Sequence, residues 1–455
     1  MISPLLTDLY QLTMAYGYWK LGIHEREAVF HQFYRKHPFG GNYAVACGLA
    51  TLVDFLNNWR FSNDDMDYLH TLQSPNQKPL FTDDFLDYLK TLRFTCDLAA
   101  VPEGELVFAN EPMVRIKGPL IQGQLLESTV LNIMNFQTLI ATKASRVYQA
   151  AKGDTVLEFG LRRAQGPDGA LSASRAAYIG GVDATSNVLA GKLYDIPVRG
   201  THAHSWVTIF PDELSAFAAY AEVMPDNCVL LVDTYDSLAG VSHAIEIGKQ
   251  LSAKGAKLLG IRLDSGDMGS LSITARQMLD QAGFSDTQIM ASNSLNEYVM
   301  ADMKEAGAQI SVWGVGTHLV TAFDQPALDG VYKLSALRDE QGTWQYKLKL
   351  SEQTAKISHP GIYQIRRYPH KDVMYDIELG MSEDLGDSYD VLIPIFEKGS
   401  LVYQQASIHA LRERAIQRVN DFIKAHANRT YPVELEKRLN HLKQQLILQV
   451  KTHGK

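Results

Sequence analysis

The chain has 455 residues, which is too long for one ordinary hydrophobic core, so we expect two or three domains. Hydrophobic residues make up 46% and charged residues 21% of the sequence, as is typical of a soluble globular protein. The formal net charge of −8 argues against broad binding to nucleic acid or to an anionic membrane, although a local basic pocket for phosphates is still compatible with it. No apolar run approaches membrane-spanning length.

The three cysteines, Cys47, Cys96 and Cys228, lie far apart in the sequence. Their odd number and wide spacing are not those of a disulfide framework or a CxxC site. The first residues carry Asp8 and no basic segment, which argues against a secretory signal. We therefore expect a cytoplasmic protein.

The first 151 residues predict a mixed α+β domain. Residues Ser3 and Pro4 are favoured as the cap and the first turn of a helix. Later segments alternate between amphipathic stretches and short strands punctuated by proline and glycine. The expected elements are a helix from Pro4, a strand over 28–38, helices over 49–59 and 83–92, short strands over 99–124 and a long helix over 127–151.

Residues 152–334 alternate apolar runs with helical stretches. Continuous apolar runs indicate strands buried on both faces, as in a parallel sheet or barrel of βα units. A complete (β/α)₈ barrel has eight strands and about 250 residues, more than this region offers. We therefore expect an irregular, incomplete α/β barrel. The six expected strands lie at 155–160, 196–201, 228–234, 257–266, 288–293 and 310–317.

Residues 335–455 return to an α+β pattern. Two segments, 332–337 and 343–351, are typical of a β-hairpin, and amphipathic helices are expected over 408–426 and 433–450. We expect this last part to pack on the N-terminal domain and complete it.

Polar residues follow each expected strand of the middle region. In parallel βα architectures the active site lies at the carboxyl ends of the strands, so these residues predict a catalytic mouth. In strand order they are Arg162 and Arg163; Thr201, His202 and His204; Asp233; Arg262, Asp264 and Asp267; Ser292 and Asn293; and Gly314, Gly316 and Thr317.

The chemistry of this set fits a ligand with phosphates, a sugar and a metal. The arginines supply positive charge, and the N–H groups of the turn at 314–317 can bind a phosphate. Asp264 and Asp267 can accept hydrogen bonds from ribose or hold Mg²⁺. These residues also have structural alternatives: Arg162 could pair with Glu158 or Asp183, and Asp267 could cap a helix.

His202 and His204 are two positions apart, and on a strand they would face the same way. They could be two metal ligands, as in zinc-dependent barrel hydrolases, with Asp233 and Asp264 as further ligands. Alternatively, one histidine works as an acid, a base or a nucleophile in an anion-binding site.

Ordered segments along the chain closely resemble the nicotinate phosphoribosyltransferase family. The resemblance implies the reaction of nicotinate, 5-phosphoribosyl 1-diphosphate, ATP and water to nicotinate mononucleotide, diphosphate, ADP and phosphate, in NAD salvage. It also implies an irregular α/β barrel joined to an N-terminal α/β domain, as a homodimer. The segments are LLTDLYQLTMAYGYW (5–19), EFGLRRAQGPDG (158–169), GGVDATSNVLAG (180–191), GTHAHSWV (200–207), LVDTYDS (231–237), RLDSGD (262–267), ASNSLNE (291–297), VWGVGTHLVTAFDQPALDGVYKL (312–334) and YPVELEKRL (431–439).

The resemblance also implies residue roles. His204 falls on the position that ATP phosphorylates transiently, Asp264 would hold the ribose hydroxyls, and His202 falls on a permissive position. Mg²⁺ would bind the diphosphate, with Asp267 as a tentative ligand. The nicotinate contacts would be Tyr10, Arg162, Thr201 and Arg262, and the phosphoribosyl contacts Arg163, Asp264, Ser292, Asn293, Gly314, Gly316 and Thr317.

Three alternatives remain at this point. A related transferase could use nicotinamide or quinolinate, although quinolinate needs extra cations for its second carboxylate. A metal-dependent barrel hydrolase would use His202 and His204. A protein that only binds phosphorylated metabolites would not need so many polar residues at one rim.

Overall fold

The computed structural model describes residues 2–351, 357–382, 386–426 and 430–453. Contacts between residues divide the chain into two compact units. Unit 1 comprises 1–139, 327–407 and 417–455, and unit 2 comprises 140–326 and 408–416. The sequence places the corresponding boundaries after residues 151 and 334. No helix in the described part of the chain is both long and apolar enough to cross a membrane.

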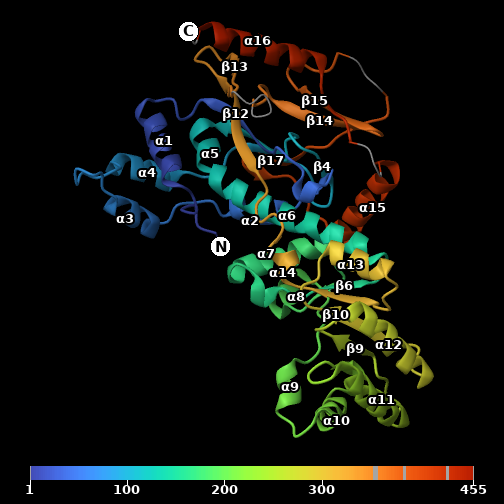
Figure 1. Cartoon of the computed structure of the whole chain (residues 1–455). Coiled ribbons are helices and arrows are strands. Elements are labelled where there is room, and N and C mark those ends of the chain that lie inside the picture. The colour runs from blue at the N-terminus through green and yellow to red at the C-terminus, as the bar shows by residue number, and fades with distance from the viewer. Residues whose placement is uncertain (1, 352–356, 383–385, 427–429, 454–455) are drawn as a thin grey trace. The chain divides into compact units, whose positions relative to one another are not determined.

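Unit 1 is built on an antiparallel sheet with the strand order β13-β12-β1-β5-β3-β17-β18. Its strands come from both ends of the sequence, and Phe30 of β1 lies opposite Leu334 of β12, whose ribbon is orange in Figure 1. The bounds are β1 Glu27–Tyr34, β3 Asp97–Ala100, β5 Val114–Pro119, β12 Gly330–Arg338, β13 Trp344–Tyr346, β17 Ile393–Glu397 and β18 Ser400–Leu401.

Two smaller sheets also belong to unit 1. One has the order β16-β14-β15-β19, and the other pairs β2 with β4. The expected hairpin after residue 332 is confirmed by the antiparallel pairing of β12 with β13. The bounds are β2 Ala44–Val45, β4 Leu106–Val107, β14 Tyr363–Tyr368, β15 Lys371–Asp376, β16 Tyr389–Asp390 and β19 Val433–Leu435.

The helices outside the middle region differ from expectation at four places. Residues 120–125 form helix α5, where the end of a run of short strands was expected. The first helix begins at Leu9 rather than at Pro4, because Ser3 and Pro4 form a turn in which the Leu6 amide donates to the Ser3 carbonyl. Helix α3 was missed, and the last helix begins later because residues 433–435 pair with β15. The bounds are α1 Leu9–Lys20, η1 Pro38–Gly40, α2 Leu49–Asn57, α3 Asn63–Thr71, α4 Asp83–Thr91, α5 Leu120–Leu125, α6 Glu127–Ala151, α15 Ile408–His426 and α16 Lys437–His453.

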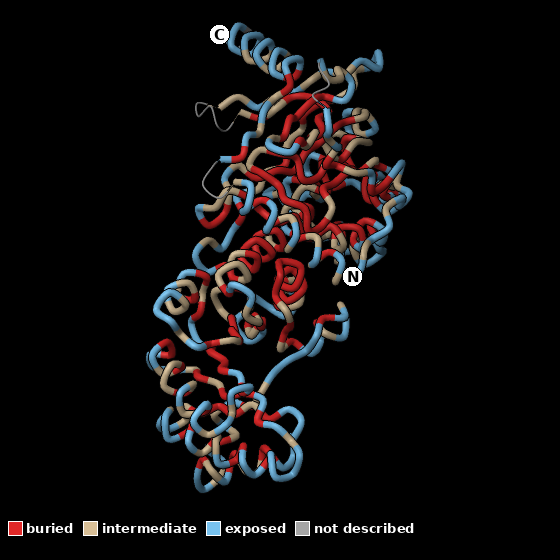
Figure 2. The backbone as a smooth tube through the Cα atoms, turned by 90° about the vertical axis from the view of Figure 1, so that its right-hand side faces the viewer, coloured by how far each residue is buried: buried red, intermediate tan, exposed pale blue. Residues whose placement is uncertain are grey.

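Unit 2 contains a parallel sheet with the strand order β7-β6-β11-β10-β9-β8. Its strands are largely buried, which agrees with their continuous apolar sequences. Figure 2 shows buried stretches of the chain in red and exposed stretches in pale blue. The chain therefore has a mixed α/β fold with a parallel sheet. The bounds are β6 Thr155–Glu158, β7 Ala184–Thr185, β8 Val229–Leu231, β9 Gly260–Leu263, β10 Gln288–Ser292 and β11 Val312–Val315.

Helices connect the parallel strands of unit 2 (Figure 1). Short loops lead from the strands into the helices, and the predicted site residues of this unit lie in these loops or at the adjoining ends of strands and helices. The bounds are η2 Leu161–Arg163, α7 Gly166–Ile179, α8 Val188–Tyr194, α9 His204–Thr208, α10 Glu213–Val223, η3 Pro225–Asn227, α11 Ser237–Ala253, α12 Met268–Gln281, α13 Glu297–Glu305 and α14 Thr317–Val320.

The expected strand at 196–201 is wrong. The segment makes one isolated parallel bridge, between Val198 and Thr185 of β7. Pro197 has no N–H group, so its carbonyl can accept from Thr185 but the ladder cannot be extended by its amide. A few residues later, Nε2 of His202 accepts a hydrogen bond from the Leu231 amide of β8, at 3.2 Å.

His202 is a buried structural side chain, with 8% of its surface exposed. Its Nδ1 lies 3.3 Å from the Ala203 carbonyl, while its Nε2 faces the Leu231 amide. A ring that donates from Nδ1 and accepts at Nε2 must be neutral. Burial lowers the pKa of His202 to about 4, and this keeps the ring neutral at physiological pH.

We predict that His202 makes the fold sensitive to mild acid. The unfolded chain would take up a proton on His202 near pH 6.5 and the folded chain only near pH 4, so lowering the pH between these values favours unfolding. The contribution of His202 should be fully present above about pH 6.5 and fall by on the order of 3 kcal/mol toward about pH 4. Urea unfolding of the wild type and of His202→Gln across this range measures it. A stability difference that does not change with pH would contradict this role.

Candidate active site

Two adjoining cavities open at the carboxyl ends of the parallel strands of unit 2. They share Phe159, Arg162, Arg262 and Asp264. The histidine cavity, of about 320 Å³, is further lined by Leu161, Ser186, Gly200, Thr201, His202, Ala203, His204 and Leu231. The glycine cavity, of about 160 Å³, is further lined by Arg163, Ser292, Asn293, Ser294, Gly314, Gly316 and Thr317.

His204 is the first residue of α9 and does not lie on a strand. Its Nδ1 is 3.1 Å from the hydroxyl of Thr234, and its Nε2 is 3.7 Å from Oδ2 of Asp264 and 4.0 Å from Oδ1 of Asp233. The side chain is 43% exposed, in contrast to the buried His202. His204 is therefore oriented by a hydroxyl on one ring nitrogen and presents the other nitrogen to two carboxylates.

The two histidines do not form a pair of metal ligands. Both ring nitrogens of His202 face backbone groups, and the expected strand that would align it with His204 is absent. Among the residues that the structure describes, no three His, Cys, Asp or Glu side chains come close enough together to hold a metal ion. A zinc site of protein ligands alone needs three or four such groups.

Arg262 is held by hydrogen bonds to three different parts of the site. Its Nε donates to the Ser292 hydroxyl at 2.8 Å, and its Nη2 donates to Oδ1 of Asp264 at 2.9 Å. Its Nη1 reaches the carbonyl of His202 at 3.4 Å. The guanidinium group also lies over the ring of Phe159, 5.8 Å from the ring centre. These contacts fix one cation at the wall between the two cavities.

Asp264 is held as a carboxylate at this wall. Burial alone would raise the pKa of its carboxyl group, but the hydrogen bond from Ser292 and the charge of Arg262 outweigh burial and lower the pKa below its usual value. Its backbone amide donates to Oδ2 of Asp233 at 2.9 Å, and the Ser265 hydroxyl donates to the same oxygen. Asp233 therefore fixes the backbone that carries Asp264.

The glycine cavity has a backbone suited to an anion. A Cβ at Gly314 would lie 2.8 Å from the ring of Phe159, so any other residue there would force this ring to move. On the facing loop, Asn293 and Ser294 adopt positive φ angles of 94° and 50°, which non-glycine residues rarely do. Such strained residues gather at ligand-binding sites, where the surrounding structure enforces them.

Two guanidinium groups at the rim have no partner in the part of the chain that is described. Arg162 lines both cavities, Arg163 lines the glycine cavity alone, and both are exposed. The structural alternative for Arg162 is wrong, because Glu158 accepts from Ser174 and Thr185, and Asp183 pairs with Arg412. Unpaired cations beside a cavity are suited to an anionic ligand.

A buried lysine connects the two loops that form the glycine cavity. Lys143 of α6 is fully buried and contacts Glu297 at 2.6 Å, at the start of the helix that follows Asn293 and Ser294. It also pairs with Asp324, which lies 3.7 Å from His318 in the helix that follows Gly316. One ammonium group thus holds both loops against α6.

The predicted site residues line these two cavities, apart from Tyr10, Asp233 and Asp267. Asp233 has a side chain that is only 1% exposed and accepts from the Asp264 amide. Tyr10 belongs to α1 in unit 1. Asp267 caps α12, which is the structural alternative that the sequence left open for it. It accepts hydrogen bonds from the amide and the hydroxyl of Ser270. Phe159 and Ser294 were missed. Phe159 lies within the predicted strand 155–160 and directly follows β6, so its place at the carboxyl end of a strand could have indicated it, but nothing in the sequence indicates the backbone of Ser294.

Most of the chain is similar to known proteins of one family. The model of the nicotinate phosphoribosyltransferase (NAPRTase) N-terminal domain matches residues 5–135, and that of the nicotinate phosphoribosyltransferase (NAPRTase) family matches residues 155–347. The nicotinate phosphoribosyltransferase of Bacillus subtilis (strain 168) is 41% identical over 476 residues, covering 98% of this chain and 95% of its own. The human enzyme of the same name is 36% identical over 414 residues, covering 79% and 75%.

Solved structures give the same result. The crystal structure of human nicotinic acid phosphoribosyltransferase superposes with a TM-score of 0.83 at 29% identity, covering 97% of this chain and 99% of that chain. A nicotinate-nucleotide pyrophosphorylase from Pyrococcus furiosus shares the fold, with a TM-score of 0.72 at 21% identity over 91% of this chain and 95% of its own. The family models and the relatives all point to one family, and the cationic histidine and glycine cavities are consistent with it. The chain belongs to the nicotinate phosphoribosyltransferase family.

Proposed function

We propose that this chain forms nicotinate mononucleotide and diphosphate from nicotinate and 5-phosphoribosyl 1-diphosphate, coupled to the hydrolysis of ATP, in NAD biosynthesis. The observation that carries this proposal is the pair of adjoining cavities with unpaired Arg162 and Arg163 at their rim. Both substrates are anions, and one must be placed beside the other for a bond to form between them. Two connected cationic cavities meet that requirement.

The chemistry needs placement and charge rather than a protein nucleophile on the sugar. As the bond from C1 of the ribose to the diphosphate breaks, positive charge develops on the sugar, and the ring nitrogen of nicotinate forms the new bond to C1. We assign the nicotinate carboxylate to Arg162, with Thr201 and Arg262 as further contacts in the histidine cavity. The carboxylate of Asp264, held at the shared wall, would accept from the ribose hydroxyls and offset the developing charge.

We assign the phosphate on the far end of the ribose to the glycine cavity. Its contacts would be Arg163, the hydroxyls of Ser292 and Thr317, the Asn293 side chain and the turn of Gly314 and Gly316. Support comes from the glycine at 314, where a side chain would strike Phe159.

The carboxylates fit a Mg²⁺ ion bound mainly by substrate phosphates, which needs one or two protein ligands. Oδ1 of Asp233 is buried without a hydrogen bond to any described residue, and Oδ2 of Asp264 faces the same space. We therefore favour Asp233 and Asp264 over Asp267, whose oxygens are engaged at the cap of α12. Bound Mg²⁺ would stabilise the negative charge of the departing diphosphate.

We propose that ATP acts through His204. The Nε2 lone pair would attack the γ-phosphorus and release ADP, and water would later cleave the P–N bond to give phosphate and free His204. Support comes from the exposure of this imidazole and from Thr234, which engages Nδ1 and leaves Nε2 as the reacting nitrogen. A phosphate on Nε2 would change the charge beside Asp264 and so couple ATP to the substrates.

Tyr10 stays a proposed nicotinate contact on the family resemblance. Its ring is 48% exposed on α1 and so is open to a ligand. Partial burial, with the nearby charges of Glu127 and Asp8, raises the pKa of its hydroxyl, which therefore stays protonated and able to donate.

We also propose that the parallel sheet of unit 2 is an irregular barrel. The strand order runs round from β7 to β8, and segment 197–202 bridges these two ends. At one end, Thr185 of β7 forms backbone hydrogen bonds with Pro197 and Arg199. At the other end, Thr201 donates to the Val229 carbonyl of β8, and His202 accepts from the Leu231 amide of β8. Irregular closure by side chains would explain why the expected strand at 196–201 has no ladder.

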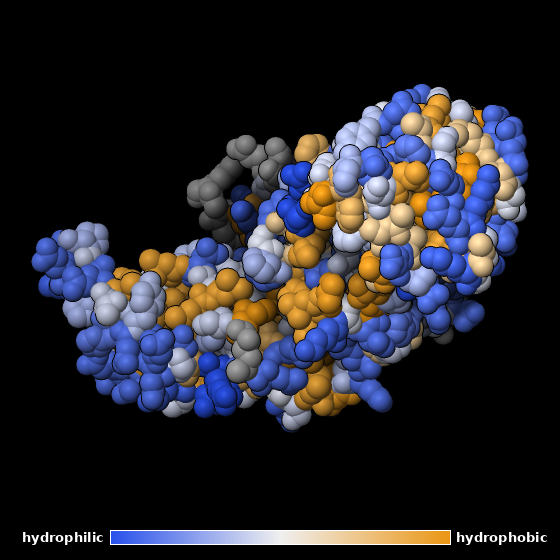
Figure 3. Space-filling view, turned by 90° about the horizontal axis from the view of Figure 1, so that it is seen from below, coloured by the Kyte–Doolittle hydropathy of each residue, from blue (hydrophilic) through white to orange (hydrophobic). Residues whose placement is uncertain are grey.

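A cytoplasmic homodimer is the proposed form of the protein. Exposed apolar side chains such as Val188, Leu193 and Ile209 support a contact with a second copy, because burial there would remove them from water. Figure 3 shows such hydrophobic groups, in orange, interrupting a hydrophilic surface. Cys47, Cys96 and Cys228 are all buried as thiols, as a reducing compartment allows.

Product analysis tests the function directly. Incubation with 5-phosphoribosyl 1-diphosphate should give the mononucleotide from nicotinate, more with ATP than without it, and little from nicotinamide or quinolinate. Nicotinamide lacks the charge that Arg162 would bind, and quinolinate has a second carboxylate. Chromatography of the products measures this, and absence of nicotinate mononucleotide under every condition would contradict the proposal.

Arg162 and Arg163 form a matched pair for assigning the cavities. Arg162→Ala should raise the KM for nicotinate by roughly 10- to 100-fold, because a charge-assisted contact is lost. Arg163 lines only the glycine cavity, so Arg163→Ala should instead raise the KM for 5-phosphoribosyl 1-diphosphate. Steady-state kinetics with each substrate varied in turn measures both KM values. The assignment of the two cavities would be reversed if Arg162→Ala raised the KM for 5-phosphoribosyl 1-diphosphate and Arg163→Ala raised that for nicotinate.

His204 should carry the coupling to ATP. We expect His204→Ala to lose the stimulation by ATP and to hold no acid-labile phosphate after incubation with γ-labelled ATP, while His202→Gln keeps both. Equal loss in the two variants, at equal thermal stability, would show that the coupling does not depend on His204.

A further inference from the structure

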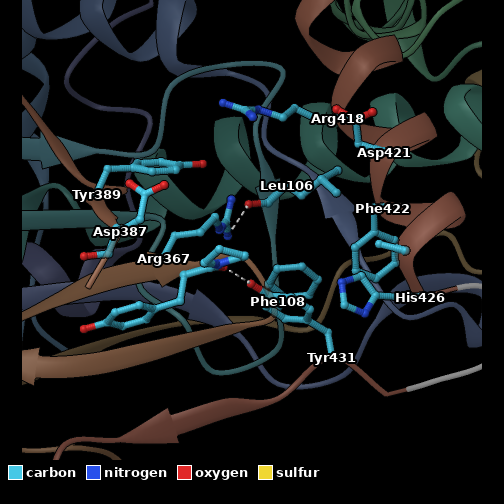
Figure 4. Close-up of a pocket in the computed structure, with 14 residues that line it drawn as sticks. Leu106, Phe108, Arg367, Asp387, Tyr389, Arg418, Asp421, Phe422, His426 and Tyr431 are labelled. Carbon is cyan, nitrogen blue, oxygen red and sulfur yellow. Dashed lines mark hydrogen bonds between the residues drawn. The ribbon is translucent and has the colours of Figure 1, made fainter. Parts of the chain in front are cut away.

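Unit 1 contains a separate cavity of about 280 Å³, which shares no residue with the histidine or glycine cavities. It lies among segment 106–108, the end of β14, residues 387–389, the second half of α15 and Tyr431, and we call it the aromatic cavity. Figure 4 shows its side chains. The proposed reaction assigns it no role.

Aromatic rings form much of the wall of the aromatic cavity. Phe108 stacks on Tyr431, with ring centres 4.1 Å apart and an interplanar angle of 21°. Phe422 packs against Phe108 with ring centres 5.5 Å apart. Tyr389 lies across the cavity from Phe422 in Figure 4 and is 43% exposed. The cavity therefore has aromatic rings on two sides, and two of these rings already lie against a cation: Arg367 is over Phe108 at 5.4 Å and Arg418 is over Tyr389 at 6.0 Å from the ring centres.

The two cations of this wall are already paired. The Arg367 side chain is 11% exposed and donates to both carboxylate oxygens of Asp372, and its Nη2 also reaches the Leu106 carbonyl (Figure 4). Arg418 donates to Glu105 at 3.0 Å. Because both guanidinium groups have carboxylate partners behind the wall, neither is left to attract an anionic ligand.

The two carboxylates of the wall are not paired with cations. Asp387 has no hydrogen bond or ion pair with any residue in the described ranges. Asp421 accepts from the neutral side-chain amide of Gln417, 2.9 Å from each oxygen. With Arg367 and Arg418 neutralised, these two exposed groups leave a surplus of negative charge beside the aromatic rings.

We propose that the aromatic cavity binds a small, planar organic cation, of the class of N-alkylated pyridinium rings without anionic groups. A cation gains from the π face of an aromatic ring and from the facing carboxylates together. The volume lies just below the range of about 300–1,000 Å³ typical of ligand sites, which suits one ring with short substituents. Nicotinate, 5-phosphoribosyl 1-diphosphate and ATP are anions, so this is no second substrate site.

Calorimetric titration of the full chain with 1-methylnicotinamide tests this proposal. The active site is first filled with saturating nicotinate, and neutral nicotinamide is the matched ligand control. We expect the cation to bind and nicotinamide to bind at least about tenfold more weakly. Asp387→Asn with Asp421→Asn should weaken binding of the cation about tenfold, at an unchanged melting temperature, because both side chains are exposed.

Three results would overturn it: no binding of the cation, equal binding of nicotinamide, or unchanged affinity in the double variant. Arg162→Ala distinguishes the two sites, since it should leave the affinity for the cation unaltered. Loss of binding in that variant would place the probe in the catalytic cavities. The proposal does not depend on the reaction, and product analysis tests the reaction separately.

Discussion

The hydrogen bonds of Arg262 are the constraint on which the site depends. One guanidinium group connects the end of β9 to Ser292 at the end of β10 and to the carbonyl of His202. Its partner Asp264 is in turn held through Asp233. Because Arg262 and Asp264 line both cavities, a change in this network would affect two ligand sites at once.

Charge pairing separates structural cations from binding cations in this unit. Lys143 is buried and the Arg262 side chain is 14% exposed, and both have carboxylate partners, so they order loops; Arg262 in addition lines both cavities. Arg162 and Arg163 are exposed and have none among the described residues, so their charge is left for a ligand. An anionic substrate would supply the missing partner of an unpaired cation beside a cavity, whereas paired charges mainly keep the loops in place.

The sequence predicted the parallel strands of unit 2 well, because β6, β8, β9, β10 and β11 are continuous apolar runs with polar residues behind them. It failed at 196–201, where composition favoured a strand but Pro197 could not extend a ladder. The pairing of β1 with β12 joins residues about three hundred positions apart, and no local pattern encodes such a register. Site residues were predictable as strand endings, whereas the ring of Phe159 and the orientation of His202 depend on tertiary packing.

A crystal structure with nicotinate mononucleotide bound would test the central assignment most directly. The account predicts the pyridine carboxylate beside Arg162 in the histidine cavity, the ribose hydroxyls on Asp264 at the shared wall, and the phosphate on the turn of Gly314 to Thr317 in the glycine cavity. A nucleotide bound in the opposite direction, or outside these two cavities, would contradict it.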